Sequence, residues 1–194
     1  MICITICGIE LAVDFTLPAT LALLLLILPQ NDVAATIFAC LLHELAHFLT
    51  LIWYKRKPTQ LRISGIGMRL AIPQTALCPM RELAVILLSG VAANFIASAS
   101  FLYLSKPFSA MTNCTLALFN LLPYRSTDGG TLLFAILEHF LTPQCPDKIR
   151  KTWRMIWISA TFSILMLCGI LRLWSVSLAA MLSFLCIMEV LVDF

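Results

Sequence analysis

The stretch Phe38–Trp53 reads FACLLHELAHFLTLIW and places two histidines and a glutamate inside an apolar run. A charged side chain at the centre of a membrane-spanning helix costs about 2.5–3.5 kcal/mol on insertion scales, so these residues require partners. On a helix, His43 and His47 lie four residues apart and share one face. Two imidazoles in this arrangement can bind one zinc ion, and Glu44 beside them can polarise a water molecule. The stretch therefore predicts a helix that carries part of a metal site.

The composition of the whole chain indicates a membrane protein. Of 194 residues, 61% are hydrophobic and 12% are charged, against roughly 25% charged in soluble domains. Because a bilayer-crossing helix takes about 20 residues, we expect one membrane domain over residues 1–194. The net charge of +3 comes from short basic clusters. Such clusters do not form a face suited to a phosphate backbone, so nucleic-acid binding is not expected.

Hydropathy predicts six transmembrane helices, near residues 12–29, 33–54, 82–104, 111–141, 153–171 and 173–192. The fourth is broken at residues 120–130, and polar backbone at that depth is tolerated only when it is buried in protein or lines a wet cavity. Residues 1–9 and 61–72 are too short to cross as helices, and their pattern favours strands. The expected fold class is an all-α membrane protein with a small β element at the membrane surface.

The basic residues predict the orientation of these spans. Ten lysines and arginines lie in the connections after the second and fourth spans, and two lie in the connections on the other side. Short cytoplasmic loops are enriched in such residues. Both termini and the mouth of the site are therefore expected on the cytoplasmic side of a bacterial membrane. The first apolar run lacks the basic region of a cleaved signal peptide, so we expect it to be retained.

A catalytic zinc takes three protein ligands and leaves a fourth position for water. The third histidine of the chain, His139, follows Glu138, and both are expected at a helix end, where a cation favours the dipole. Asp128 is the better candidate, because it offers a hard oxygen ligand in the broken fourth span. Gly129 and Gly130 beside it let the backbone approach closely.

Three motifs share the spacing of one known family. The first is H-E-x-x-H at residues 43–47, and the second is N-x-x-P at residues 120–123 with a D-G pair eight residues after the asparagine. Residues 90–94 of the third span are similar to a G-P-x-x-N motif. Together they resemble the site-2 proteases, which are intramembrane zinc metalloproteases. The resemblance covers nearly the whole chain.

Two residues depart from the family pattern. Val91 stands where a proline is usual, and Thr127 stands where a leucine usually precedes the aspartate. These departures affect the shape of the helices more than the assignment of ligands. The compact outline is closest to the branch that contains the stage IV sporulation processing protease, which removes the membrane-associated pro-segment of a sigma factor.

The resemblance implies roles for the site residues. Zn²⁺ would be held by His43, His47 and Asp128, and Glu44 would act as general base and then pass its proton to the leaving nitrogen.

Four further residues are predicted to bind substrate: Asn94, Asn120, Pro123 and Gly129. Asn94 or Asn120 could donate a hydrogen bond to the substrate or to the developing oxyanion. An interhelical hydrogen bond is an equally good interpretation of Asn94. Asn120 and Pro123 could also act only by shaping the break that presents Asp128.

The expected partners are the lipid bilayer and a membrane-embedded or membrane-associated protein substrate, with a regulatory membrane protein as a further candidate. A helical substrate must be unwound before its peptide bonds are accessible. The predicted strand at residues 61–72 could hold it open by adding it as another strand. The alternative is a structural hairpin that covers the cytoplasmic mouth.

Rival functions remain open at this point. A membrane zinc protease of the prenyl-processing type also carries H-E-x-x-H but takes a downstream glutamate as third ligand, and Glu138 and Glu189 lack the expected surroundings. A membrane metal transporter would place its ligands along a path, whereas this chain gathers them at one point. A catalytically dead, substrate-binding relative would have lost Glu44 or a ligand.

Overall fold

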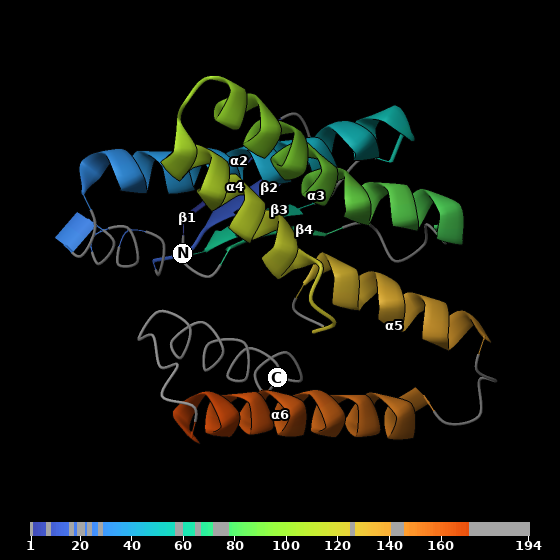
Figure 1. Cartoon of the computed structure of the whole chain (residues 1–194). Coiled ribbons are helices and arrows are strands. Elements are labelled where there is room, and N and C mark those ends of the chain that lie inside the picture. The colour runs from blue at the N-terminus through green and yellow to red at the C-terminus, as the bar shows by residue number, and fades with distance from the viewer. Residues whose placement is uncertain are drawn as a thin grey trace. The chain divides into compact units, whose positions relative to one another are not determined.

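The computed structural model describes a set of residues that form helices and a small sheet (Figure 1). These are residues 2–6, 9–15, 18, 22, 25–26, 29–56, 60–64, 67–71, 78–124, 127–140 and 146–170. The chain divides into two compact units, Met1–Phe119 and Asn120–Phe194.

The sheet belongs to the first unit and has four strands, β1 (Ile2–Ile6), β2 (Ile9–Val13), β3 (Gln60–Ser64) and β4 (Gly67–Ala71). They lie side by side in that order. The pairs β1–β2 and β3–β4 are antiparallel, whereas β2–β3 is parallel. A parallel pair needs a crossover connection, and here the helix α2 (Gln30–Trp53) lies between β2 and β3 in the chain. Glu10 faces Gln60 in the parallel register, and the Gln60 amide donates to the Glu10 carboxylate at 3.3 Å.

The predicted β element is confirmed, with one change of extent. The strand expected at residues 1–9 is a pair of strands that runs on to Val13. Ala12 and Val13, predicted to start the first span, belong to β2 instead, because they continue the strand pairing with β3. Most of that span, residues 14–29, lies outside the described residues.

Two long helices of the first unit, α2 and α3 (Met80–Tyr103), pack against each other. Each begins after a proline, Pro29 or Pro79, whose ring presets the backbone for a helix start. Among the described residues, these two helices are long and apolar enough to cross a membrane. They confirm helices at the second and third predicted spans.

The burial pattern of α2 is inverted relative to that of a helix in water. His43 and His47 are buried, whereas Leu41, Leu45 and Leu49 are each about half exposed or more, with 54%, 50% and 56% of their surface accessible. Exposed leucines and buried imidazoles are unfavourable in water but favourable where the surrounding solvent is lipid. The pattern therefore supports a bilayer around this helix.

Both helices end in the same way. Lys55 and Ser105 have a left-handed backbone, each with φ of 56°. After α2, the N–H groups of Lys55 and Arg56 donate to the Ile52 and Leu51 carbonyls, and the corresponding bonds follow α3. This is the Schellman arrangement, which satisfies the last carbonyls of a helix.

An ion pair joins the start of α3 to the end of α2. The Arg56 Nε lies 2.8 Å from the Glu82 carboxylate, and this hydrogen bond raises the pKa of the Arg56 guanidinium above its usual value. Near this pair, burial raises the pKa of the Cys78 thiol. The two helices are therefore tied together at one end by a charged contact.

Two separate helices lie in the region of the predicted fourth span. The helix α4 (Pro107–Asn120) ends at Asn120, and α5 begins at Asp128 and runs to Phe140. Within the second unit, α6 (Pro146–Ile170) holds the connecting segment, because the Trp153 indole donates to the Pro123 carbonyl at 3.2 Å and Tyr124 hydrogen-bonds Thr161. Residues 153–170 of the fifth predicted span lie in α6, and residue 171 lies outside the described residues. The sixth, residues 173–192, lies outside the described residues, so the count of six spans stays a prediction.

Replacing Ser105 by glycine is expected to stabilise the protein. A side chain in the left-handed region costs about 1–2 kcal/mol. Glycine avoids this cost, but it loses more conformational entropy on folding, which offsets part of the gain. We therefore expect Ser105→Gly to raise the free energy of unfolding by about 0.5–1 kcal/mol, measured by thermal unfolding in detergent. Ser100→Gly, at an exposed position inside α3, should lower it. Equal losses of stability in the two variants would contradict the assignment.

Candidate metal centre

The two histidines of α2 form a buried pair. The Nε2 atoms of His43 and His47 lie 3.1 Å apart, and their rings meet edge to face with centroids separated by 4.7 Å. Their exposed fractions are 5% and 7%. The pair follows directly from the helix, because residues four apart lie one above the other on the same face.

The spacing of the two Nε2 atoms suits a shared metal ion. Zinc–nitrogen bonds of about 2.0–2.1 Å place two ligand atoms of a tetrahedral site about 3.3 Å apart. The measured separation of 3.1 Å is close to this value. The pair is therefore arranged to bind one small divalent cation through its Nε2 atoms.

The neighbouring helix α3 leaves room for the pair through a glycine. A Cβ atom added at Gly90 would lie 2.6 Å from the His47 Nε2 and 2.8 Å from the His43 Nε2. Both distances are shorter than van der Waals contact allows, so any larger residue would displace the imidazoles. Gly90 therefore lets the backbone of α3 form one wall of the site.

The carboxylate of Asp128 is presented by the start of α5. Thr127 precedes it as an N-cap residue, because its hydroxyl oxygen accepts a hydrogen bond from the Gly130 N–H at 3.3 Å. The same hydroxyl donates to the Tyr124 carbonyl at 2.8 Å. Asp128 is the first residue of the helix, where the dipole favours a negative charge. The departure from the family pattern at position 127 thus has a structural role.

The two glycines after Asp128 allow the first turn of α5 to pack closely against the segment that precedes it. A Cβ atom at Gly129 would lie 2.6 Å from the Leu121 carbonyl oxygen, and one at Gly130 would overlap the Tyr124 carbonyl group. The predicted close approach of the backbone at these positions is therefore observed.

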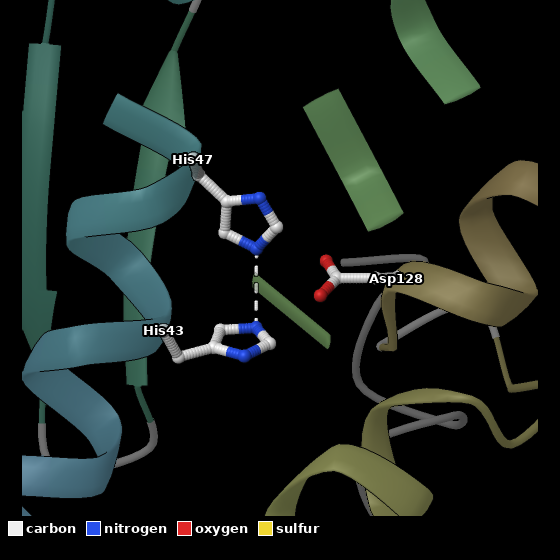
Figure 2. Close-up of side chains that lie close together, drawn as sticks. All are labelled: His43, His47 and Asp128. Carbon is white, nitrogen blue, oxygen red and sulfur yellow. Dashed lines mark hydrogen bonds between the residues drawn. The ribbon is translucent and has the colours of Figure 1, made fainter. Parts of the chain in front are cut away.

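Three predicted ligands form one group among the described residues. One ligand atom from each of His43, His47 and Asp128 lies within 4.8 Å of the other two (Figure 2). Two imidazole nitrogens and a carboxylate oxygen are a donor set that catalytic zinc sites use, with a further position left for water or substrate. The residues present therefore fit a zinc ion.

The other predicted site residues take separate places in the fold. Glu44 is half-buried on α2, and Asn94 is fully buried on α3. Neither polar atom of the Asn94 amide has a hydrogen-bond partner among the described residues. Asn120 is the last residue of α4, and Pro123 lies in the segment before α5. The catalytic and substrate-binding roles of these residues remain predictions.

Sequence reasoning missed two parts of the site. Thr127 was noted only as a departure, although a threonine directly before an Asp-Gly-Gly helix start is a recognisable cap. The second is the contact between the His47 Nδ1 and the Ile86 carbonyl oxygen of α3, 2.7 Å apart, because no side-chain pattern encodes a main-chain carbonyl.

Two buried histidines and a half-buried carboxylate have the donor set of catalytic zinc sites. Residues 105–167 match the model of peptidase family M50. The chain is similar in fold to the site-2 protease from Methanocaldococcus jannaschii, with a TM-score of 0.69 and 22% sequence identity over 97% of this chain and 93% of that protein. No curated protein matches the sequence significantly.

These matches confirm the resemblance to the site-2 proteases that the motifs predicted. The matched region contains Asp128 and the broken fourth span, and the peptidase family supports a protease. Among the described residues, the two helices α2 and α3 are long and apolar enough to cross a membrane, which fits an integral membrane protein.

Replacing Gly130 by alanine is expected to destabilise the start of α5. The added methyl group overlaps the Tyr124 carbonyl, so the backbone must shift, and overpacking of this kind costs about 1–3 kcal/mol or more. Gly129→Ala should cost less, because its nearest contact is longer. Thermal unfolding of both variants in detergent tests this order, and the reverse order would contradict the described packing.

Proposed function

We propose that this protein is an intramembrane zinc metalloprotease that cleaves a membrane-embedded or membrane-associated protein. The observation that carries the proposal is the group formed by His43, His47 and Asp128, whose ligand atoms lie within 4.8 Å of one another. When bound, zinc polarises a carbonyl and lowers the pKa of a coordinated water towards about 7.

Glu44 is the proposed general base. It follows His43 on the same helix and is half-buried, so its carboxylate belongs to the same part of α2 as the two ligands. A carboxylate there can take a proton from the attacking water and deliver it to the leaving nitrogen.

Asn94 is the proposed donor to the substrate. It lies one helical turn after Gly90, on the face of α3 that adjoins the histidine pair. A fully buried amide without a protein partner is costly unless a ligand or water completes it. A substrate carbonyl would supply the missing acceptor. Asn120, Pro123 and Gly129 are proposed to shape the approach to Asp128.

The sheet offers a way to hold the substrate open. β4 is the last strand in the order β1-β2-β3-β4, so one of its edges is left without a strand partner among the described strands, and β4 also contacts α2. An extended substrate segment can pair with such an edge through main-chain hydrogen bonds, with little demand on its sequence.

The finer proposals concern the biological setting. We propose that the termini and the mouth of the site face the cytoplasm of a bacterial cell, as the basic connections indicate. The proposed substrate class is a membrane-tethered transcription regulator, with a pro-sigma factor as the first candidate. A regulatory membrane protein would act on access to the mouth.

Glu44→Gln is expected to abolish cleavage while zinc remains bound, because the amide cannot accept the proton but leaves the ligands in place. The assay is co-expression with candidate membrane-tethered transcription factors, followed by detection of a shortened product, together with metal analysis of the purified protein. Glu138→Gln, at an exposed position of α5, is the matched control and should retain cleavage. Undiminished proteolysis by the Glu44 variant would remove this residue from its role.

Asp128→Ala is expected to lower both zinc content and cleavage. Loss of a ligand should weaken zinc binding by more than the roughly 10–100-fold that changes outside the ligand set cost. Competition with a chelator measures the affinity, and Asp32→Ala, in the first turn of α2, is the control. An Asp128 variant that binds zinc like the control would exclude this carboxylate as a ligand.

A further inference from the structure

The second ring nitrogen of His47 is held by the backbone of α3. The His47 Nδ1 lies 2.7 Å from the carbonyl oxygen of Ile86, and both residues are buried. A carbonyl oxygen can only accept a hydrogen bond, so the hydrogen between these atoms belongs to Nδ1. In the neutral ring, Nε2 then carries the lone pair. The contact thus leaves the nitrogen nearer His43 available to a metal.

Ser89 contacts both partners of this hydrogen bond. Its hydroxyl donates to the same Ile86 carbonyl at 2.7 Å, and its Oγ lies 3.4 Å from the His47 Nδ1. Because the hydroxyl hydrogen points to the carbonyl, the Oγ lone pairs remain as a second, weaker acceptor for the Nδ1–H. The His47 Nδ1–H therefore faces two oxygen acceptors, the Ile86 carbonyl and the Ser89 hydroxyl, which lie on the same turn of α3.

Gly90 lies beside the other nitrogen of the His47 ring. A Cβ atom added at Gly90 would lie 2.6 Å from the His47 Nε2, so only glycine leaves room for the ring. The ring therefore lies along the bare surface of α3, with Nδ1 at the Ile86 carbonyl and Nε2 beside Gly90. We name this set of contacts, formed by Ile86, Ser89 and Gly90, the α3 seat.

We propose that the α3 seat fixes His47 in its Nδ1–H tautomer and that Ser89 is a positioning residue for the metal site. A ligand histidine that donates its second N–H to an oxygen is held in orientation and becomes a stronger ligand. The role of Ser89 rests on the proposed zinc site, whereas the tautomer of His47 is a property of the metal-free protein.

The first test reads the tautomer directly. Nitrogen-15 NMR of the metal-free, full-length protein in detergent, labelled at histidine, should show a protonated Nδ1 and an unprotonated Nε2 for His47. The chain has three histidines, so single substitutions of His43 and His139 assign the signals. An Nε2–H tautomer at His47 would overturn the proposal.

The second test measures zinc affinity by chelator competition and the absorption spectrum of the Co²⁺ form. Ser89→Ala should weaken zinc binding about 10-fold, the lower end of the range for changes beyond the ligands, and should alter the Co²⁺ bands. Ser89→Thr retains a hydroxyl that can bond to the preceding turn and should restore both. Ser100→Ala removes a hydroxyl that also bonds to a helix carbonyl, at Ile96, and should change neither.

The outcomes separate this proposal from the proposed function. Absence of zinc binding by the unsubstituted protein would contradict the metalloprotease proposal, and the tautomer measurement would still stand. Zinc binding by Ser89→Ala equal to that of Ser100→Ala, with an unchanged Co²⁺ spectrum, would overturn the role of Ser89 alone.

Discussion

The crossing of α2 and α3 at Gly90 is the contact on which the site depends. Two imidazoles can remain buried between apolar helices only if their polar atoms find partners there. The bare backbone of α3 provides the space, and the Ile86 carbonyl provides an acceptor for His47. The Arg56–Glu82 ion pair joins the end of α2 to the start of α3. The geometry of the histidine pair is therefore a consequence of how closely the backbones of α2 and α3 approach.

The parts of this structure that the sequence predicts well are local. The histidine pair follows from a spacing of four residues on one helix, and α2 and α3 follow from long apolar runs that lipid favours. The break before Asp128 follows from Pro123, which disfavours a continuous helix, and Gly129 and Gly130 let α5 begin close to the preceding chain. In each case the residues that determine the feature lie within about two helical turns of it.

The features that the sequence did not predict depend on distant backbone atoms. The parallel pairing of β2 with β3 joins Glu10 to Gln60, fifty residues apart, and carried the first strand pair into the predicted span. The left-handed Ser105 has a side chain where glycine is usual. Asp128 was expected as the third ligand from its place in the broken fourth span, and the family resemblance gave the same residue. Its distance from the histidines could not be predicted, because no local pattern relates residues about eighty positions apart.

The position of the histidines along α2 has a further consequence. His47 and His43 lie seven and eleven residues before Tyr54, which ends the helix, so at 1.5 Å per residue they are about 10 and 16 Å from that end. An extended chain covers about 3.3 Å per residue. Under the proposed function, an extended substrate segment that entered beside the Arg56–Glu82 pair would need at least about three to five residues to reach this depth. The depth of the histidines would then set a minimum length for the unwound part of a substrate.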